Sequence, residues 1–311
     1  MGREGRGRLS RSRAGNRVTR QTSFAFKRND LARPFLKWAG GKRQLLPEIR
    51  KLIPREFGTY FEPFVGAGAV LFDLQPPRAV INDANEELIN CYRVVKTNPE
   101  ELIRLAAKHE RNDSAEYFYE LRALDREPGL DALPDVARAA RVIYLNKTGF
   151  NGLYRVNRRG YFNVPYRHHV KTPQVVNADV IRAVSRYLNS ARMKILCGDF
   201  KRVVADASDG DFIYFDPPYD PVSLTSSFTG YAAGGFGEEE QKALKRLCDD
   251  LTRRSCRVLL SNSDTEFVRS LFDDPRRYTV HEVRARRNIN RDGARRGEVG
   301  ELLIFNNYNV P

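Results

Sequence analysis

The sequence predicts an open α/β fold, and three stretches carry that prediction. Residues 211–219, DFIYFDPPY, begin as an apolar run typical of a buried strand and stop at two prolines. Residues 59–74 place Gly66 and Gly68 between a short apolar strand and a helical pattern. The next apolar strand, 79–81, ends at Asn82 and Asp83. A strand, a glycine turn, a helix and a strand-end acid are typical of a nucleotide-binding, Rossmann-like sheet.

Composition describes a folded, basic protein. The 311 residues can form one large or two modest domains, and a hydrophobic content of 41% can build a core. A formal net charge of +14 favours a polyanionic partner such as nucleic acid or an acidic membrane surface. Residues 1–30 hold nine basic and two acidic side chains, so half of the net charge lies in this stretch and half in the remainder.

Several classes of protein are excluded by what the sequence lacks. No apolar run approaches the ~20 residues of a membrane span, and no signal-peptide core is present. The cysteines show no zinc-site spacing, and the four histidines include one close pair. We therefore expect a reduced, cytosolic, metal-free protein. The cysteines are Cys91, Cys197, Cys248 and Cys256.

The first part of the chain predicts an arm followed by an ordered start. Residues 1–32 are rich in Arg, Ser and Gly, which predicts a disordered basic arm that adds non-specific nucleic-acid affinity. A transit peptide is the alternative. Order is expected to begin at Phe35 with FLKWAGGK, followed by a helix that ends near Leu52. The GGK lacks the GxxxxGK[ST] spacing of a phosphate loop, so an NTPase is excluded.

The middle of the chain changes from helical to strand-like patterns. Residues 86–145 predict several helices, to which we assign packing alone. Residues 153–156 and 161–164 alternate in polarity around Asn-Arg-Arg-Gly, which predicts a β-hairpin with a basic tip. A two-stranded ribbon fits the major groove of DNA. The alternative is a solvated basic hairpin.

The last part of the chain returns to alternating helices and strands. A helix at 180–188 and a strand at 194–197 lead to Asp199 and Phe200, a second strand-end acid beside an aromatic residue. Residues 223–237 are rich in Ser, Thr and Gly and predict a lid. The remaining predictions are a helix at 238–251, a strand at 257–260, a cap at 261–264 for a helix that ends at 272, and strands at 278–284 and 301–306 around the basic loop 286–297.

The DPPY tetrapeptide predicts chemistry on an amino group. Ligands of open α/β sheets bind beyond the carboxyl ends of the strands, so the tetrapeptide should lie in the site. Asp216 and the carbonyl of Pro217 could accept both hydrogens of one amine, which would localise its lone pair for attack on an electrophilic methyl. Tyr219 offers a ring for base stacking, worth about 1 to 3 kcal/mol. An ordinary strand ending in a proline turn is the alternative.

Several motifs, in order, resemble the Dam-type DNA adenine methyltransferases, which are the class alpha, D12 family. They are FLKWAGGK, FEPFVGAGAV, NKTGFNGLYR with FNVP, FDPPY, FTGYAAGGF, LLSNSD and ELLI. The resemblance begins near Phe35 and reaches the C-terminus. It implies a Rossmann-like S-adenosylmethionine-dependent methyltransferase sheet with an inserted helical and β-hairpin target-recognition domain. Residues 33–95 and 186–311 would form the catalytic domain, and residues 96–185 the insertion.

The resemblance also implies roles for individual residues. Positions that contact S-adenosylmethionine match Trp38, Lys42, Asp83 and Asp216. The glycine loop of the family matches Glu62, Pro63, Phe64, Gly66 and Gly68, and the contact with the adenine of the cofactor matches Asp199 and Phe200. Positions that read 5′-GATC-3′ match Lys37, Asn151, Leu153, Arg155 and Pro165, with Arg155 on a guanine. Residues 166–169, YRHH, depart from the Phe-Gly-rich continuation of the family at the edge of this site.

The implied function is methyl transfer from S-adenosylmethionine to the N6 amine of an adenine flipped out of duplex DNA, within GATC and without a metal. The catalytic residues would be Asp216, Pro217, Pro218 and Tyr219. Methylation of cytosine at carbon 5 requires a thiolate, and the sequence has no Pro-Cys motif to supply one. The partner would be double-stranded DNA and not a membrane. We expect a monomer that is cytoplasmic, nucleoid-associated and encoded by a bacterium or a phage. A methyltransferase of RNA adenine or protein glutamine and a non-catalytic DNA-binding relative remain open.

Overall fold

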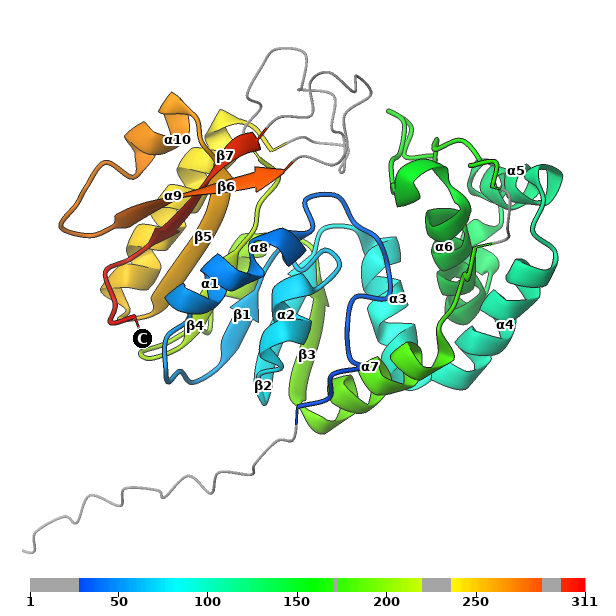
Figure 1. The fold of residues 1–311 in the computed structure, drawn as a ribbon, viewed down its shortest axis with the longest axis horizontal. Helices are drawn as coiled ribbons and strands as arrows, with labels where there is room; N and C mark the ends of the chain where they lie inside the picture. Colours follow the sequence, from blue (N-terminus) through cyan, green and yellow to red (C-terminus); the bar gives the residue numbers. More distant parts are fainter. Residues whose placement is uncertain (1–27, 170–172, 220–235, 287–297, 311) are drawn as a thin grey trace, which may run out of the picture.

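One mixed sheet organises the protein. The computed structural model describes residues 28–169, 173–219, 236–286 and 298–310. In these residues the sheet has the order β3-β2-β1-β4-β5-β7-β6; the first five strands are parallel, and β7 runs antiparallel to both of its neighbours (Figure 1). The strands are β1 (Tyr60–Glu62), β2 (Arg78–Asp83), β3 (Arg192–Cys197), β4 (Phe212–Phe215), β5 (Arg257–Ser263), β6 (Thr279–Arg286) and β7 (Glu298–Phe305).

The strand order reverses between β1 and β4. From β1 the chain proceeds outward through β2 and β3, and β4 then starts the other half of the sheet. Ligands of doubly wound sheets bind at such a switch point, beyond the carboxyl ends of the strands. The Rossmann-like fold predicted from the sequence is confirmed.

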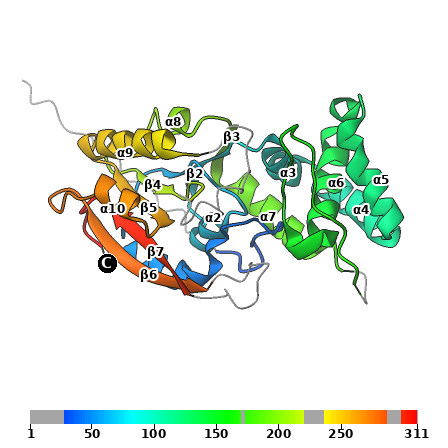
Figure 2. The same cartoon turned by 90° about the horizontal axis from the view of Figure 1, so that it is seen from above.

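Helices cover both faces of the sheet, and alternation along β4 shows why. Phe212 and Tyr214 pack into one core cluster, whereas Ile213 and Phe215 pack into the other. Figure 2 shows α8 and α9 on one side of the sheet and α2 on the other. The helices of these two layers are α1 (Leu46–Leu52) and α2 (Ala69–Leu74) on the first cluster, and α8 (Phe200–Val203), α9 (Glu238–Arg253) and α10 (Glu266–Leu271) on the second. A 3-10 turn, η1 (Lys42–Gln44), precedes α1.

A helical region is inserted between β2 and β3. Figure 1 shows α3 and α7 beside the sheet and α4, α5 and α6 farther out. Asn85 and Asn177 cap α3 and α7 by accepting hydrogen bonds from backbone N–H groups. The helices are α3 (Glu86–Thr97), α4 (Pro99–Arg111), α5 (Ala115–Ala123), α6 (Asp135–Thr148) and α7 (Ala178–Ser190), with 3-10 turns η2 (Leu124–Arg126), η3 (Leu130–Ala132) and η4 (Phe150–Gly152). The helices predicted over residues 86–145 are therefore confirmed.

The predicted β-hairpin is present as a bridged loop and not as a pair of strands. An isolated antiparallel bridge joins Val156 to Phe162. Asn157 N donates to Tyr161 O at 2.8 Å and Asn163 N donates to Arg155 O at 2.9 Å, one on each side of this bridge. The backbone groups of Phe162 face away from Val156 and bond to side chains of η2: its N–H donates to Asp125 Oδ2 at 2.6 Å, and its carbonyl accepts from Arg126 Nη2 at 2.8 Å.

The ordered chain begins before the predicted start at Phe35. Asn29 and Gln75 exchange two hydrogen bonds, from Asn29 N to Gln75 Oε1 and from Gln75 Nε2 to Asn29 O, both at 2.9 Å. Ala32 is buried. Residues 28–32 therefore pack against the body of the protein, and assigning them to the arm was wrong. Residues 1–27 lie outside the described part of the chain.

The helix cap predicted at residues 261–264 differs from the cap in the structure. Residues 261–263 belong to β5, and Thr265, rather than residues 261–264, caps the next helix by accepting from Val268 N. Most of the predicted lid and the basic loop, residues 220–235 and 287–297, lie outside the described residues. Within the described residues, every helix is too short or too polar to cross a membrane.

Candidate active site

The predicted site residues meet at the ends of β1, β2 and β4. One cavity at the switch point is lined by the chain around Gly41 and Lys42, by Glu62 at the end of β1, by Gly66 of the glycine loop and by Asp216 after β4. Asp83 ends β2 beside them. Parallel strands end at the same edge of a sheet, so residues distant in the sequence share this site.

The glycine loop has a backbone that requires glycine. Gly66 and Gly68 have φ values of 49° and 72°, in the left-handed region. A Cβ on Gly68 would lie 2.6 Å from the hydroxyl of Tyr92 and 2.9 Å from the ring of Phe72. The hydroxyl of Tyr92 donates to the carbonyl of Gly66 at 3.0 Å, so the α3 helix also fixes the loop.

Asp83 supports the glycine loop and does not cap a helix. Its Oδ2 accepts from Gly66 N at 3.1 Å, and its Oδ1 accepts from Asn85 N at 3.0 Å. The cap of α3 is Asn85, whose side chain accepts from Leu88 N. Burial raises the pKa of Asp83, and the backbone N–H groups oppose that rise. A carboxylate oxygen has two lone pairs, so each oxygen can still accept from a ligand hydroxyl.

Asn82, which the sequence did not single out, joins three strand ends. Its Nδ2 donates to the carbonyl of Pro63 at 2.9 Å and to the carbonyl of Gly198 at 3.0 Å. Its own carbonyl accepts from Val65 N at 2.8 Å. Position 82 thereby links the tips of β1, β2 and β3 and holds the glycine loop against the sheet.

Asp216, Lys42 and Tyr219 form the polar centre of the site. Lys42 Nζ lies 2.8 Å from Asp216 Oδ1 and 4.5 Å from the centroid of the Tyr219 ring. It also donates to the carbonyl of Gly40 at 2.6 Å. Burial raises the pKa of Asp216 to about 6, and the charge of Lys42 opposes this rise. Pro217 is buried and Pro218 is exposed. Lys42 thus occupies one of the acceptor atoms that the sequence assigns to an amine.

Glu62 lies beneath this centre. It is 2% exposed, and the hydroxyl of Tyr60 donates to its Oε2 at 2.9 Å. Burial raises the pKa of Glu62 well above its ordinary value, and the nearby charge of Asp216 contributes to that rise. A carboxyl group in this position favours its neutral form and can then donate a hydrogen bond itself.

Aromatic rings line the flanks of the site. Trp38 stacks on Tyr154 with ring centroids 5.0 Å apart. Phe200 packs against Phe64 with ring centroids 5.1 Å apart and against Phe236 with ring centroids 5.8 Å apart. Phe236 is the first described residue after residue 219 and belongs to the predicted lid. Asp199 caps α8 through Lys201 N and is exposed. These rings offer flat surfaces suited to the base of a nucleoside.

Three of the five predicted base-reading residues, Lys37, Leu153 and Arg155, are sequence neighbours of Trp38 and Tyr154, whose rings stack at the flank of the site. Asn146, at the end of α6, accepts from Lys37 N at 3.0 Å and donates to Lys37 O at 2.8 Å, so the two segments are fastened together. Arg155 Nε donates to Asn163 Oδ1 at 2.7 Å, which orients the exposed guanidinium. Leu153 is partly buried, whereas three of the five are exposed in addition to Arg155: Lys37, Asn151 and Pro165. Their role as base contacts stays a prediction.

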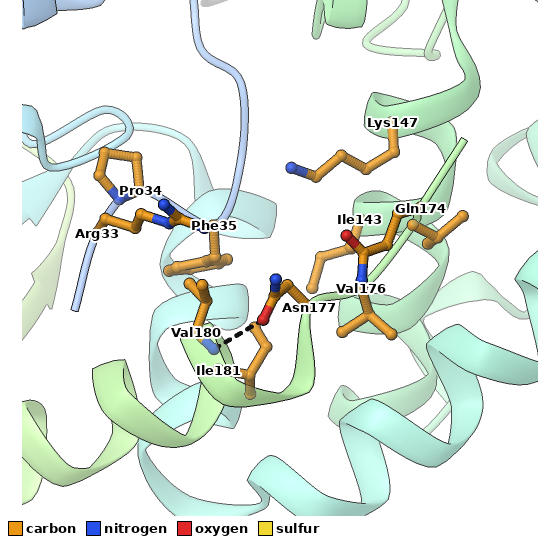
Figure 3. A pocket seen from close by; sticks show the side chains of 11 residues that line it. Arg33, Pro34, Phe35, Ile143, Lys147, Gln174, Val176, Asn177, Val180 and Ile181 are labelled. Atoms are coloured by element: carbon orange, nitrogen blue, oxygen red, sulfur yellow. Dashed lines mark hydrogen bonds between the residues drawn. The ribbon is translucent and has the colours of Figure 1, made fainter. Parts of the chain in front are cut away.

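A second cavity adjoins these residues, with a volume of about 180 Å³. Figure 3 shows Lys147 pointing across it toward the segment that carries Arg33 and Phe35. Burial is the main cause that lowers the pKa of Lys147 to about 8, and the positive charges of Lys37 and Arg33 contribute to this lowering. Within the described chain these three cations form no ion pair with a carboxylate. We call Arg33, Lys37 and Lys147 the cationic cluster.

Sequence reasoning missed Asn82, Lys147 and Glu301, whose Oε2 accepts from the hydroxyl of Tyr219 at 2.6 Å. Two of the three lie in motifs that carried the resemblance: Lys147 in NKTGFNGLYR and Glu301 in ELLI. An acid that opens an apolar strand and a lysine within a predicted DNA-contact segment were the available signals. Among the described residues, no three His, Cys, Asp or Glu side chains gather as a metal site would require.

Comparison with known proteins gives concordant matches. A family model described as D12 class N6 adenine-specific DNA methyltransferase matches residues 38–289. A Type II methyltransferase of Lactococcus lactis subsp. cremoris is 46% identical over 274 residues, which cover 88% of this chain and 95% of that protein. A Type II methyltransferase of Methanocaldococcus jannaschii is 39% identical, with 88% and 99% covered. The DNA adenine methylase of Escherichia coli is 36% identical, with 88% and 95% covered.

Proposed function

Because the chain belongs to the D12 class N6 adenine-specific DNA methyltransferases, we propose that it methylates a flipped-out adenine within 5′-GATC-3′ in duplex DNA. The protein is an enzyme, and its reaction is methyl transfer to the N6 amine of adenine in DNA. The methyl donor of the family is S-adenosylmethionine. The extruded base, the recognition sequence and the roles of single residues are the finer parts of the proposal.

The residues of the switch point fit the methyl donor. Lone pairs left on the carboxylate of Asp83 could accept from the ribose, and the rings of Trp38 and Phe200 would hold the adenosine. Lys42 and Asp216 supply one charge of each sign for the amino acid portion. When bound, the donor supplies an electrophilic methyl on a sulfonium. No metal takes part in the proposed reaction.

The observation that carries the proposed chemistry is the position of Asp216 beside the ring of Tyr219 at the end of β4. Asp216 and the carbonyl of Pro217 accept the two hydrogens of the adenine N6 amine once Lys42 releases Oδ1. The N6 lone pair then forms a bond to the methyl carbon while the carbon–sulfur bond breaks toward sulfur. The methylated nitrogen afterwards loses one proton to solvent. Residues of this chain orient and desolvate the amine, and no covalent enzyme intermediate forms.

The surroundings of the site support duplex DNA as the substrate. In the duplex one N6 hydrogen is held in the base pair and the faces of the adenine are covered by stacked bases, so the base must leave the stack at a cost of a few kcal/mol before N6 can attack. The cationic cluster and the exposed Arg155 have the charge that a phosphate backbone and a guanine edge require, and Lys37 and Arg155 each adjoin a ring of the Trp38–Tyr154 stack in the sequence. We assign Arg155 to a guanine of GATC. The enzyme would act as a monomer in the cytoplasm of a bacterium or of a cell that a phage has infected.

Competition between acceptors tests this function. Labelled S-adenosylmethionine is offered with duplex DNA, single-stranded RNA and a glutamine-containing peptide in one reaction. We expect label on adenine N6 of the DNA alone, and Asp216→Ala should lose at least 10² in turnover, the range found for loss of one preorganised polar group, while remaining folded. Preferential labelling of RNA or peptide, or normal turnover in Asp216→Ala, would contradict the proposal. Absence of donor binding would indicate a non-catalytic relative.

A further inference from the structure

We propose that Glu301 is a positioning residue of the reaction. Its carboxylate holds the hydroxyl of Tyr219 and thereby fixes the ring on which the target base stacks. The inference rests on the proposed function, because Glu301 acts through a residue of the same site. It assigns a task to a side chain at the opposite end of the sequence from the glycine loop.

The contact is short and charge-assisted. Tyr219 Oη donates to Glu301 Oε2 at 2.6 Å, within the range for a hydroxyl donating to a carboxylate. Burial raises the pKa of Tyr219 well above its ordinary value, and the negative charges of Asp216 and Glu301 raise it further. The phenol therefore keeps its proton and remains the donor at any pH at which the enzyme would work.

The topology of the sheet explains why this carboxylate reaches the site. Because β7 runs antiparallel to β5, a residue near the start of β7 lies at the edge where the parallel strands end. Glu301 pairs with Ser263, the last residue of β5. Alternation places Glu301 on the same face as Leu303, which packs in the first core cluster with Tyr214 of β4. That is the face on which Lys42 meets Asp216.

Tyr219 needs such an anchor because its own backbone provides little. It follows two prolines, which have no N–H to donate to a ladder. Among the described residues, its ring has two polar contacts: the ammonium of Lys42 near its centroid and the carboxylate of Glu301 on its hydroxyl. Lys42 covers one face of the ring, and the other face is the one we assign to the base. A small rotation of the ring would displace the amine from the methyl, and transfer rates are sensitive to such displacements.

The matched variants are Glu301→Gln and Glu301→Leu, each made in the wild type and in Tyr219→Phe. Gln keeps an oxygen that can accept from the phenol, whereas Leu keeps only bulk. Glu282→Gln on β6 is the control, since this exposed carboxylate pairs with Arg269 away from the site. We measure single-turnover methylation at saturating DNA and donor, the KM for S-adenosylmethionine, and the melting temperature of each variant.

We expect Glu301→Leu to slow methyl transfer roughly ten- to hundredfold, the range for loss of a hydrogen bond to a charged group. The KM for the donor should stay within about twofold, since donor binding does not use this contact. Glu301→Gln should keep most of the wild-type rate. In the Tyr219→Phe enzyme, where the contact is already absent, Glu301→Leu should lower the rate little further. The control should match the wild type.

Three results would overturn the inference while leaving the proposed function intact. Glu301→Gln and Glu301→Leu could lose equal amounts of rate, or Glu301→Leu could slow the Tyr219→Phe enzyme as much as it slows the wild type. The third is a wild-type rate in Glu301→Leu. If Glu301→Leu fails to fold, Glu301→Ala, which also removes the acceptor, replaces it in the cycle with Tyr219→Phe, and the same criterion of additivity decides. A wild-type protein that methylates no DNA would instead contradict the proposed function itself.

Discussion

At Asp216 two environments act on one carboxyl group. Burial at the end of β4 raises its pKa to about 6, while the ammonium of Lys42 at 2.8 Å favours the ionised form. The proposed reaction uses the ionised form, because a protonated carboxyl loses one acceptor site for the adenine amine. The burial that excludes water from the site therefore also raises the pKa of Asp216 toward neutral pH.

We predict that methyl transfer falls as the pH is lowered through about 6, as protonation removes the acceptor oxygen. In Asp216→Asn, which keeps an acceptor without a titratable proton, the rate should be lower but its dependence on pH between 5 and 7, roughly one unit either side of that pKa, should flatten. Single-turnover methylation across this range measures both. An unchanged low-pH decline in Asp216→Asn would assign the titration to another group.

Folding stability should depend on the same proton with the opposite sign. The folded-state pKa of about 6 lies above the ordinary value of 3.8, so the folded protein binds this proton more tightly than the unfolded chain. The contribution of Asp216 to the free energy of unfolding is fully present below pH 3.8 and is lost as the pH rises through about 6. Urea unfolding of wild type and Asp216→Asn at pH 5 and 7 should therefore differ in slope against pH. Parallel curves would contradict this assignment.

Residue types in DPPY predicted an amine-binding carboxylate and a stacking ring from the sequence alone. The partners of those residues could not be predicted in the same way. Lys42 reaches Asp216 because η1 lies over the switch point, and Glu301 reaches Tyr219 because β7 enters the sheet antiparallel. Both contacts depend on strand order, which local patterns do not determine.

At the scale of elements, the glycine loop provides a sharp test of packing. We predict that Gly68→Ala lowers the free energy of unfolding by about 2 to 4 kcal/mol, because the new Cβ adds a clash with Tyr92 to the strain of a left-handed backbone. Gly160→Ala is the matched control, since its φ is also positive but nothing lies within 4 Å of its Cβ position. It should cost about 1 kcal/mol.

Urea unfolding measures both glycine variants. Equal losses of stability in the two would show that backbone strain alone, and not the packing of Tyr92 and Phe72, fixes the loop. A large loss in Gly68→Ala alone would show that the packing of Tyr92 and Phe72 against Gly68 fixes the loop.

Apolar runs and strand-end polar residues predicted the parallel strands because both faces of such strands are buried. The hairpin was harder to predict, since its outer edge is bonded to Asp125 and Arg126 of η2 through the backbone groups of Phe162, a contact that no local pattern indicates. Residues 261–263 were assigned to a helix cap because they are polar, but Ser261 lies in β5 and its hydroxyl bonds to that of Tyr214 at 2.6 Å. In each case a tertiary partner overrode a local pattern.

At the scale of the whole molecule, the cationic cluster is one place where part of the net charge of +14 is concentrated. Arg33 lies between the core residues Ala32 and Phe35, and Lys147 lies in the last turn of α6, so the cluster joins the start of the described chain to the inserted helices. Three like charges without carboxylate partners in the described chain repel one another until an anion binds. A DNA phosphate would relieve that repulsion.

We predict that Lys147→Gln weakens duplex binding to all sequences alike and lowers the salt slope of the binding constant by about 1. Wild-type affinity should also fall as the pH rises through about 8, because Lys147 loses its charge there, and the variant should lack much of this fall. Lys51→Gln is the control, since Lys51 is exposed and pairs with Glu48. Fluorescence anisotropy at several salt concentrations measures the slope. Equal slopes for both variants would exclude Lys147 from phosphate binding.

Methyl transfer from labelled S-adenosylmethionine to two duplexes that differ only in whether they contain GATC tests both the reaction of this enzyme and its recognition sequence. The modified base is then identified. We predict label on the N6 of adenine in the GATC duplex alone. Adenine label on both duplexes would keep the chemistry and refute the assignment of Arg155 and its neighbours to GATC, whereas label on neither duplex would contradict the account of this protein as a methyltransferase of duplex DNA.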